Sequence, residues 1–158
     1  MKRHTRPIDR IVIHCAATPA GRDVTVAEIR RWHVEERGWD DIGYHWVVGL
    51  DGSVWPGREE AWQGAHVAGH NNGSIGVCYV GGTDGRGDPA DTRTPEQRRV
   101  LPELLEAIAA RHGHVGEDGR RRRALFGHRD LDEGKACPSF DVAQDYGRAV
   151  AERPAAET

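Results

Sequence analysis

The stretch ALFGHRDLDEGKACP (residues 124–138) carries an apolar run directly into a polar loop. We expect residues 124–127 to form a strand, because a short apolar run bounded by polar segments is typical of one. The loop contains an imidazole (His128), an ammonium (Lys135) and a thiol (Cys137), and a proline that cannot continue a helix closes it. Catalytic zinc sites usually take three protein ligands and a water, with histidine and cysteine among the preferred ligands. The loop therefore offers two candidate metal ligands, and a third must come from elsewhere. The alternative for these two residues is a surface histidine and an inert buried thiol.

The best candidate for the third ligand is His14, which follows the apolar run Ile11–Ile13. β-Branched residues between polar segments predict a short buried strand over residues 10–15. The period of two places His14 on one face of this strand and Cys15 on the other, where we expect Cys15 to pack in the core. His14 then projects from the end of a rigid element, which suits a ligand. The alternative is a core histidine that hydrogen-bonds to the backbone.

Two helices carry start signals in the sequence. Thr25–Glu28 has the capping-box pattern, in which a hydroxyl and a carboxylate satisfy free amides, and Gly38 is a natural end. Thr94–Gln97 opens a second helix with a similar pattern, and Pro102 inside that helix should kink it or delay its regular start. We interpret His33, on the first helix, as a half-buried packing residue, with a role as metal ligand as the alternative.

Strand and turn signals complete the secondary structure. The remaining predicted segments are a strand at 43–50, a turn at 51–52, a returning strand at 53–55, a central buried strand at 74–80, an exposed loop at 81–91, a solvated basic lead-in at 120–123 and a last helix at about 141–151. This alternation predicts an α/β fold, with a central mixed sheet flanked by helices. We expect a single domain over residues 8–152, with flexible tails at 1–7 and 153–158. The expected core contains Ile11, Ile13, Ile75, Val77, Leu104, Leu105 and Leu125.

Two segments outside the loop are further candidates for function. Tyr44 and His45 begin the strand at 43–50, where a side chain can lean into a cleft, and the residues alone do not choose between them. The connection at 56–73 is long for a compact domain and rich in His and Asn, which favours a binding loop over a spacer. It contains His66 and Asn72.

Composition excludes several classes of protein. The chain has 158 residues, of which 37% are hydrophobic and 30% charged, as in soluble globular domains. A net charge of -3 argues against a general affinity for nucleic acid. Three cysteines do not form a disulfide framework. We see no secretory signal and no run long enough to span a bilayer, so we expect synthesis in the cytoplasm without insertion into a membrane.

Several motifs, in order along the chain, together resemble one family. They are IHCAAT (13–18), EIRRWH (28–33), GW (38–39), GYH (43–45), DG (51–52), NGSIGVC (72–78), GG (81–82) and KACPSFD (135–141). In these motifs the chain resembles the zinc-dependent N-acetylmuramoyl-L-alanine amidases of the peptidoglycan recognition protein superfamily. It is most similar to the small amidase-type lysozymes (endolysins) of T-odd coliphages. The resemblance covers about residues 10–142.

The resemblance implies one zinc ion per chain, held by His14, His128 and Cys137. It implies Tyr44 and Lys135 as the catalytic partners, and it places His66 in the substrate cleft, where we also expect Asn72. The implied reaction is hydrolysis of the amide between N-acetylmuramic acid and the L-alanine of the stem peptide by a zinc-activated water. The implied partner is bacterial peptidoglycan, and we expect a monomer.

Three alternatives stay open. A peptidoglycan-binding module without catalysis is the first, and Cys137 argues against it because non-catalytic relatives commonly lack that ligand. A two-carboxylate glycosidase using Asp130, Asp132 and Glu133 is the second, although a polar loop explains these acids by ordinary solvation. A regulatory contact with an RNA polymerase, as in related phage lysozymes, is the third. As an enzyme without a signal peptide, the protein would reach the cell wall by a separate route, such as a membrane-permeabilising partner.

Overall fold

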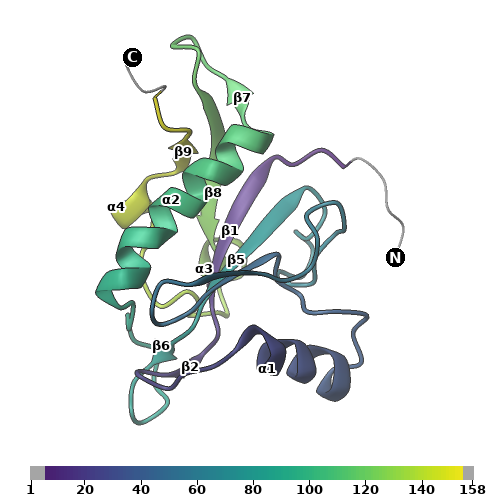
Figure 1. The fold of residues 1–158 in the computed structure, drawn as a ribbon, viewed down its shortest axis with the longest axis vertical. Helices are drawn as coiled ribbons and strands as arrows, with labels where there is room; N and C mark the ends of the chain where they lie inside the picture. Colours follow the sequence, from purple (N-terminus) through teal and green to yellow (C-terminus); the bar gives the residue numbers. More distant parts are fainter. Residues whose placement is uncertain (1–5, 155–158) are drawn as a thin grey trace.

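The computed structural model describes residues 6–154. Most of the two predicted tails, residues 1–5 and 155–158, therefore lies outside the described part. The described chain folds around one seven-stranded mixed sheet and a separate two-stranded sheet (Figure 1). The single α/β domain with a mixed central sheet is as predicted. Within residues 6–154, no helix has both the length and the apolar character needed to cross a membrane.

The main sheet has the strand order β4-β3-β5-β1-β8-β7, and β9 also pairs with β8. Its strands are β1 (Arg10–Cys15), β3 (Trp46–Val48), β4 (Val54–Pro56), β5 (Ser74–Tyr79), β7 (His114–Val115), β8 (Arg121–Gly127) and β9 (Ala149–Ala151). The small sheet pairs β2 (Thr18–Pro19) with β6 (Gly82–Thr83). β1 lies at the centre, parallel to β5 on one side and to β8 on the other. Strands buried on both faces are near-continuous apolar runs, which is why β1 and β5 were recognisable in the sequence.

The helices are α1 (Val26–Arg31), the π-helical turn η1 (Trp32–Glu36), α2 (Pro95–His112), α3 (His128–Leu131) and α4 (Val142–Tyr146). Thr25 accepts a hydrogen bond from the Glu28 amide at the start of α1, and Thr94 and Gln97 form a reciprocal capping box on α2. Both predicted helix starts are confirmed. α2 runs without interruption through Pro102, so the predicted delay of its start is wrong.

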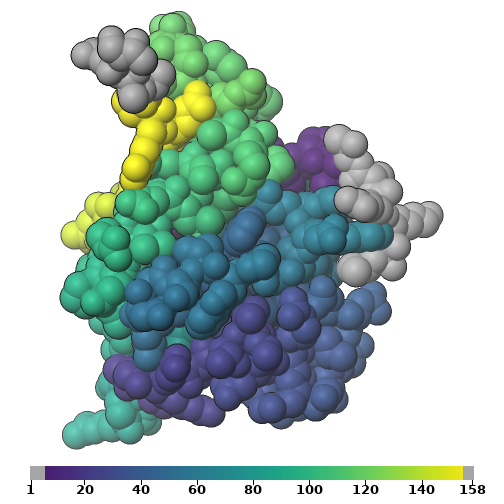
Figure 2. All heavy atoms as spheres, viewed as in Figure 1, coloured from purple at the N-terminus to yellow at the C-terminus, as the bar shows by residue number. Residues whose placement is uncertain are grey.

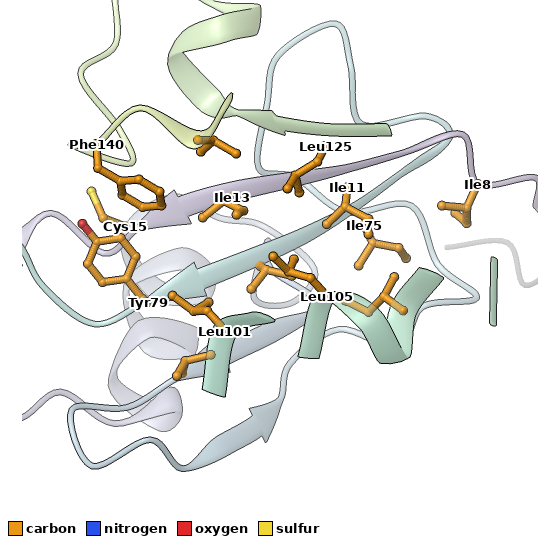
Figure 3. Close-up of a cluster of buried hydrophobic side chains, with 14 residues drawn as sticks. Ile8, Ile11, Ile13, Cys15, Ile75, Tyr79, Leu101, Leu105, Leu125 and Phe140 are labelled. Atoms are coloured by element: carbon orange, nitrogen blue, oxygen red, sulfur yellow. The ribbon is translucent and has the colours of Figure 1, made fainter. Parts of the chain in front are cut away.

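The two faces of the sheet have different roles. Fourteen buried side chains fill the face under α2, with Ile11 and Ile13 of β1 meeting Leu101 and Leu105 of the helix (Figure 3). The space-filling view shows α2 and the segment around residues 50–60 on the surface of the molecule on this side (Figure 2). A smaller apolar cluster that includes Ile29 of α1 packs separately. Because side chains alternate along β1, His14 points away from the α2 core.

The expected core is confirmed with one adjustment. Six of the seven predicted residues are buried, and Leu104 packs against the cluster while staying half-exposed. The strand predicted at 43–50 is shorter, at Trp46–Val48, and it still forms the predicted hairpin with β4.

Three predicted segments differ from the structure. The helix predicted at about 141–151 ends at Tyr146, because Gly147 takes a positive φ and Ala149–Ala151 pairs with β8. The loop predicted to be exposed at 81–91 begins with two buried glycines and contains β6. The basic lead-in belongs to β8 itself, and Arg123 is buried there, donating hydrogen bonds to the carbonyls of Ile8 and His112.

Candidate functional site

His14 and His128 meet because two parallel strands end side by side. Ile13 of β1 is in register with Gly127 of β8, so the residue that follows each of them lies at the same edge of the sheet. The Nδ1 atoms of the two histidines are 3.2 Å apart, and their ring centroids are 4.7 Å apart. His14 is buried, whereas His128 is half-buried at the start of α3.

The loop after α3 returns Cys137 to the same place. The Arg129 amide donates to the Cys137 carbonyl at 2.8 Å, and the Cys15 amide donates to the Cys137 sulfur at 3.2 Å. These bonds place Sγ 3.8 Å from Nδ1 of His14. One ligand atom from each of His14, His128 and Cys137 lies within 4.8 Å of the others, as a metal site requires. Three residues distant in the sequence thus form one candidate metal centre.

The spacing and chemistry of these donors fit a tetrahedral ion such as zinc. With metal–nitrogen and metal–sulfur bonds of about 2.0–2.3 Å, neighbouring ligand atoms are about 3.3–3.6 Å apart. The spacings of 3.2 and 3.8 Å around His14 Nδ1 are close to this range. Burial, and then the neighbouring histidines, hold the pKa of His14 well below its usual value, so its ring is neutral. A hydrogen bond with the Cys15 side chain, together with burial, raises the pKa of the Cys137 thiol. A thiolate is therefore disfavoured here unless a cation lies beside it.

Tyr44 forms the wall next to His14. Its ring centroid is 5.1 Å from that of His14 and 5.4 Å from that of His33, so the phenol is held between two imidazoles. His33 is fixed in turn, because its Nδ1 accepts a hydrogen bond from the Gly43 amide at 2.9 Å. Burial and the nearby cysteine thiols raise the pKa of Tyr44 well above its usual value. Its hydroxyl is therefore a hydrogen-bond donor at neutral pH.

His45 is buried away from the metal centre. Its Nδ1 accepts from the Gly76 amide at 2.9 Å, and its Nε2 lies 2.8 Å from the Trp62 carbonyl. Both ring nitrogens are engaged with the backbone, and burial lowers its pKa to about 4. Of the two neighbours that the sequence left open, only Tyr44 reaches the cleft.

His128, Cys137 and Tyr44 line a cleft with a volume of about 620 Å³. Lys135 is exposed at its rim, and Asp132 lies beside it. Another part of the lining comes from α1 and η1 and from the turn that follows them, and it includes Trp32, Trp39, Glu36 and Arg37. Sequence reasoning had assigned no function to this part of the lining. The only signal for it was the resemblance in EIRRWH and GW.

Of the two residues predicted to bind substrate, His66 lies at the cleft, as expected, and Asn72 lies elsewhere in the same loop. His66 borders the cleft but is buried, with only 8% of its surface exposed. Asn72 is exposed and is not among the described residues that line the cleft. Its neighbour Asn71 lines the cleft, and its Oδ1 accepts from the amides of His66 and Val67 at 2.8 and 2.9 Å. The tandem Asn-Asn signalled the site, but only the folded loop shows which of the two faces inward.

Of the three acids considered for a glycosidase, Asp130 has a structural partner. Its carboxylate accepts a hydrogen bond from the Gly127 amide at 2.7 Å, which closes the first turn of α3. Asp132 Oδ1 lies 3.1 Å from the Gly134 amide, and Glu133 is exposed. Local backbone capping thus accounts for two of these three acids.

A mixed sheet whose strand ends bring two histidines and a cysteine into an open cleft is the architecture of a peptidoglycan-amidase domain. The N-acetylmuramoyl-L-alanine amidase family matches residues 4–140 of this chain, and the chain belongs to that family of enzymes. Among its relatives are phage endolysins.

Two endolysins and one solved structure illustrate the similarity. The chain is 43% identical over 133 residues to the endolysin of Klebsiella phage KP32, covering 84% of this chain and 82% of the relative. It is 43% identical over 134 residues to the endolysin of Escherichia phage T7, covering 85% and 82%. The complex of peptidoglycan recognition proteins LCa and LCx with tracheal cytotoxin contains a similar fold. There the TM-score is 0.71 at 27% identity, over 90% of this chain and 84% of that one.

Proposed function

We propose that this protein is a zinc-dependent endolysin-like amidase. It cleaves the amide between the lactyl group of N-acetylmuramic acid and the L-alanine of the stem peptide. The observation that carries the proposal is the convergence of His14, His128 and Cys137 in the cleft of a chain that belongs to the amidase family. His14 and His128 would hold the ion through ring nitrogens, and Cys137 through its sulfur.

The donor set suits this chemistry. Two neutral imidazoles and one thiolate leave a divalent ion with a formal charge of +1 and room for another ligand. A bound zinc ion supplies activation of water at neutral pH and polarisation of the scissile carbonyl. The Cys15 amide contributes a hydrogen bond to the sulfur, which favours its ionised form.

Tyr44 and Lys135 provide the remaining groups. Hydrolysis of an amide builds negative charge on the carbonyl oxygen, and it requires a proton for the leaving amine. The Tyr44 hydroxyl is protonated at neutral pH and can donate a hydrogen bond to that oxygen. The Lys135 ammonium, exposed at the rim, can meet the same charge or donate a proton to the amine. In the sequence Tyr44 lies between His14 and His128, and Lys135 lies between His128 and Cys137. Each of the two groups can serve either task.

The substrate fits the dimensions and the wall of the cleft. A volume of about 620 Å³ exceeds what one amide needs, so sugar and peptide on either side of the bond can be held. Trp32 and Trp39 offer aromatic surface, and Glu36 and Arg37 offer charges to polar groups of the stem peptide. The monomeric state, the separate route to the cell wall and a contact with RNA polymerase stay predictions.

The test is an assay of purified protein on peptidoglycan. We expect new amino groups on L-alanine, no new reducing sugars, and about one zinc per chain by elemental analysis. A chelator should abolish the release of new amino groups, and added zinc should restore that release. Reducing ends without new amino groups would contradict the amidase reaction, and full activity of metal-free protein would contradict the role of zinc. Binding to peptidoglycan without any cleavage would indicate a recognition module.

A further inference from the structure

A chain of hydrogen bonds runs behind His14, away from the cleft. His14 Nε2 lies 2.8 Å from His66 Nδ1, and His66 Nε2 lies 3.1 Å from the hydroxyl of Ser74. That hydroxyl is 2.9 Å from the His70 carbonyl and 3.1 Å from the Asn71 carbonyl. The chain thus connects the buried nitrogen of a candidate metal ligand to the backbone of the 56–73 connection.

The direction of every bond in this chain follows from its last member. A backbone carbonyl can only accept, so the single hydroxyl proton of Ser74 is donated to it. The Ser74 oxygen must then accept from His66 Nε2–H. His66 is buried, and the hydrogen bonds of its ring go to His14 and Ser74 rather than to a carboxylate, so the ring is neutral and Nδ1 is an acceptor. His14 therefore carries its proton on Nε2, which leaves the lone pair of Nδ1 facing His128 and Cys137.

The ring of His66 is also held by shape. A Cβ atom at Gly76, in the middle of β5, would lie 2.6 Å from the ring, and one at Gly64 would lie 2.7 Å from it. Both glycines leave the space that the imidazole fills, because no side chain could share it. The backbone amide of His66 is fixed by Asn71 at 2.8 Å. The ring therefore has one position, set by the sheet on one side and the loop on the other.

We propose that His66 is a positioning residue for His14, which selects the His14 tautomer with a free Nδ1 and fixes the ring toward the metal centre. Both ring nitrogens of His66 are engaged, so neither is free to bind substrate. This differs from the substrate contact that the sequence predicted for His66. Metal-binding histidines typically donate their second nitrogen to such a partner, and losing that partner typically costs about 10- to 100-fold in metal affinity. This positioning role can be tested in two ways. The His14 tautomer can be measured without zinc, whereas the measurement of zinc affinity rests on the proposed metal centre.

The first readout needs neither zinc nor activity. In metal-free protein, ¹⁵N NMR of the His14 ring should show the tautomer protonated at Nε2. His66→Leu introduces an apolar side chain of moderate size and removes the Nδ1 acceptor. We therefore expect the His14 tautomer protonated at Nδ1 to gain population. His66→Asn is the matched variant, because its amide oxygen can take the place of Nδ1. It should keep the Nε2–H tautomer.

The second readout is zinc affinity, measured by competition with a chelating dye. We expect the zinc affinity of His66→Leu to be about 10- to 100-fold lower than that of the wild type. The zinc affinity of His66→Asn should stay within about threefold of the wild-type value. Leu105→Ala, in the core under α2, controls for general destabilisation and should leave zinc affinity unchanged. Ser74→Ala should lower zinc affinity a few fold and allow both tautomers of His66. This variant replaces His66→Leu in the test if His66→Leu fails to fold.

The outcomes separate this inference from the proposed function. An unchanged His14 tautomer and unchanged zinc affinity in His66→Leu, or in Ser74→Ala if only that variant folds, would overturn the positioning role. A loss of affinity as large in Leu105→Ala as in His66→Leu would also overturn it. If the wild type binds no zinc, the proposed function fails, whereas the tautomer measurement still decides the inference.

Discussion

At the scale of single residues, the two nitrogens of His14 have different partners. Nδ1 faces His128 and Cys137, while Nε2 faces His66 inside the protein. A surface histidine could exchange these roles by rotating, but a side chain with 1% exposure between a strand and a packed loop cannot. Burial therefore gives this imidazole, a candidate metal ligand, a single orientation.

Cys137 and Lys135 are two residues apart, and their substitutions should have different effects. Cys137→Ser replaces a soft ligand by a poor neutral one, so we expect loss of zinc and of turnover with the fold preserved. Lys135→Ala should keep its zinc, because an ammonium is not a ligand, and lose about 100- to 1,000-fold in turnover. Zinc content, circular dichroism and release of amino groups are measured on both variants. Retention of zinc and full activity by Cys137→Ser would mean that another residue is the ligand.

At the scale of elements, a buried arginine joins α4 to the segment before α2. The Arg93 guanidinium lies 3.4 Å above the Phe140 ring and donates to both carboxylate oxygens of Asp91 at 2.9 Å. It also pairs with Asp145 of α4, and Arg98 of α2 reaches Asp91 at 2.8 Å. The Arg93 side chain thus fixes the backbone at the point where KACPSFD (135–141) continues into α4, directly after the loop that carries the candidate ligand Cys137.

This junction makes stability depend on pH in acid. The hydrogen bonds from Arg93 are the main cause that lowers the pKa of Asp91 to about 2, below its value of about 3.9 in an unfolded chain. Because the folded pKa is the lower one, this stabilisation is complete above about pH 4 and is lost as the pH falls toward 2. We expect Asp91→Asn to cost about 1–2 kcal/mol in unfolding free energy at pH 7 and almost nothing near pH 2.

Urea unfolding at both pH values measures the difference between wild type and Asp91→Asn. Glu117→Gln changes a carboxylate at an exposed position and is the control for the change in net charge. A cost of Asp91→Asn that is equal at pH 7 and pH 2 would show that the carboxylate charge is not what holds the junction.

At the scale of the whole molecule, most of the main core and the candidate metal centre lie on opposite faces of the sheet. The fourteen-residue core lies on the face covered by α2 (Figure 3). Because side chains alternate along β1, His14 projects from the other face. Substrate and metal can therefore be exchanged at the cleft without opening the main core. The candidate ligands come from two strand ends and one loop beside this core. Cys15 belongs to the core and also lines the cleft, so the core borders the site directly.

We accordingly expect metal-free protein to stay folded. Chelation should leave the far-UV circular dichroism unchanged and lower the melting temperature by an amount that depends on free zinc. Zinc at 100 times its dissociation constant stabilises the folded state by about 2.7 kcal/mol. Calorimetry with and without a chelator checks this. Loss of secondary structure on chelation, as in small zinc-dependent domains, would show that the metal is part of the folding free energy.

Sequence by itself determined the elements whose signals are local. The apolar runs of β1 and β5, the capping box of α2 and the strand that leads into His128 were all read correctly. The three candidate ligand positions were also named in advance, as a hypothesis from the residue types that the family resemblance supported, and the structure brings them together. Periodicity and capping involve residues within one or two turns, so no tertiary contact is needed to recognise them.

Tertiary structure alone decided the features that depend on distant partners. Ala149–Ala151 became a strand because the edge of β8 was free to pair with it, and Arg123 could be buried because carbonyls from two other segments accept from it. His66 and Asn71 face inward because a loop closes on Gly76 of β5. Hydrogen bonds and packing across tens of residues have no local signature in the sequence. For that reason the candidate ligands could be predicted from the sequence, whereas the positioning role that we propose for His66 could not.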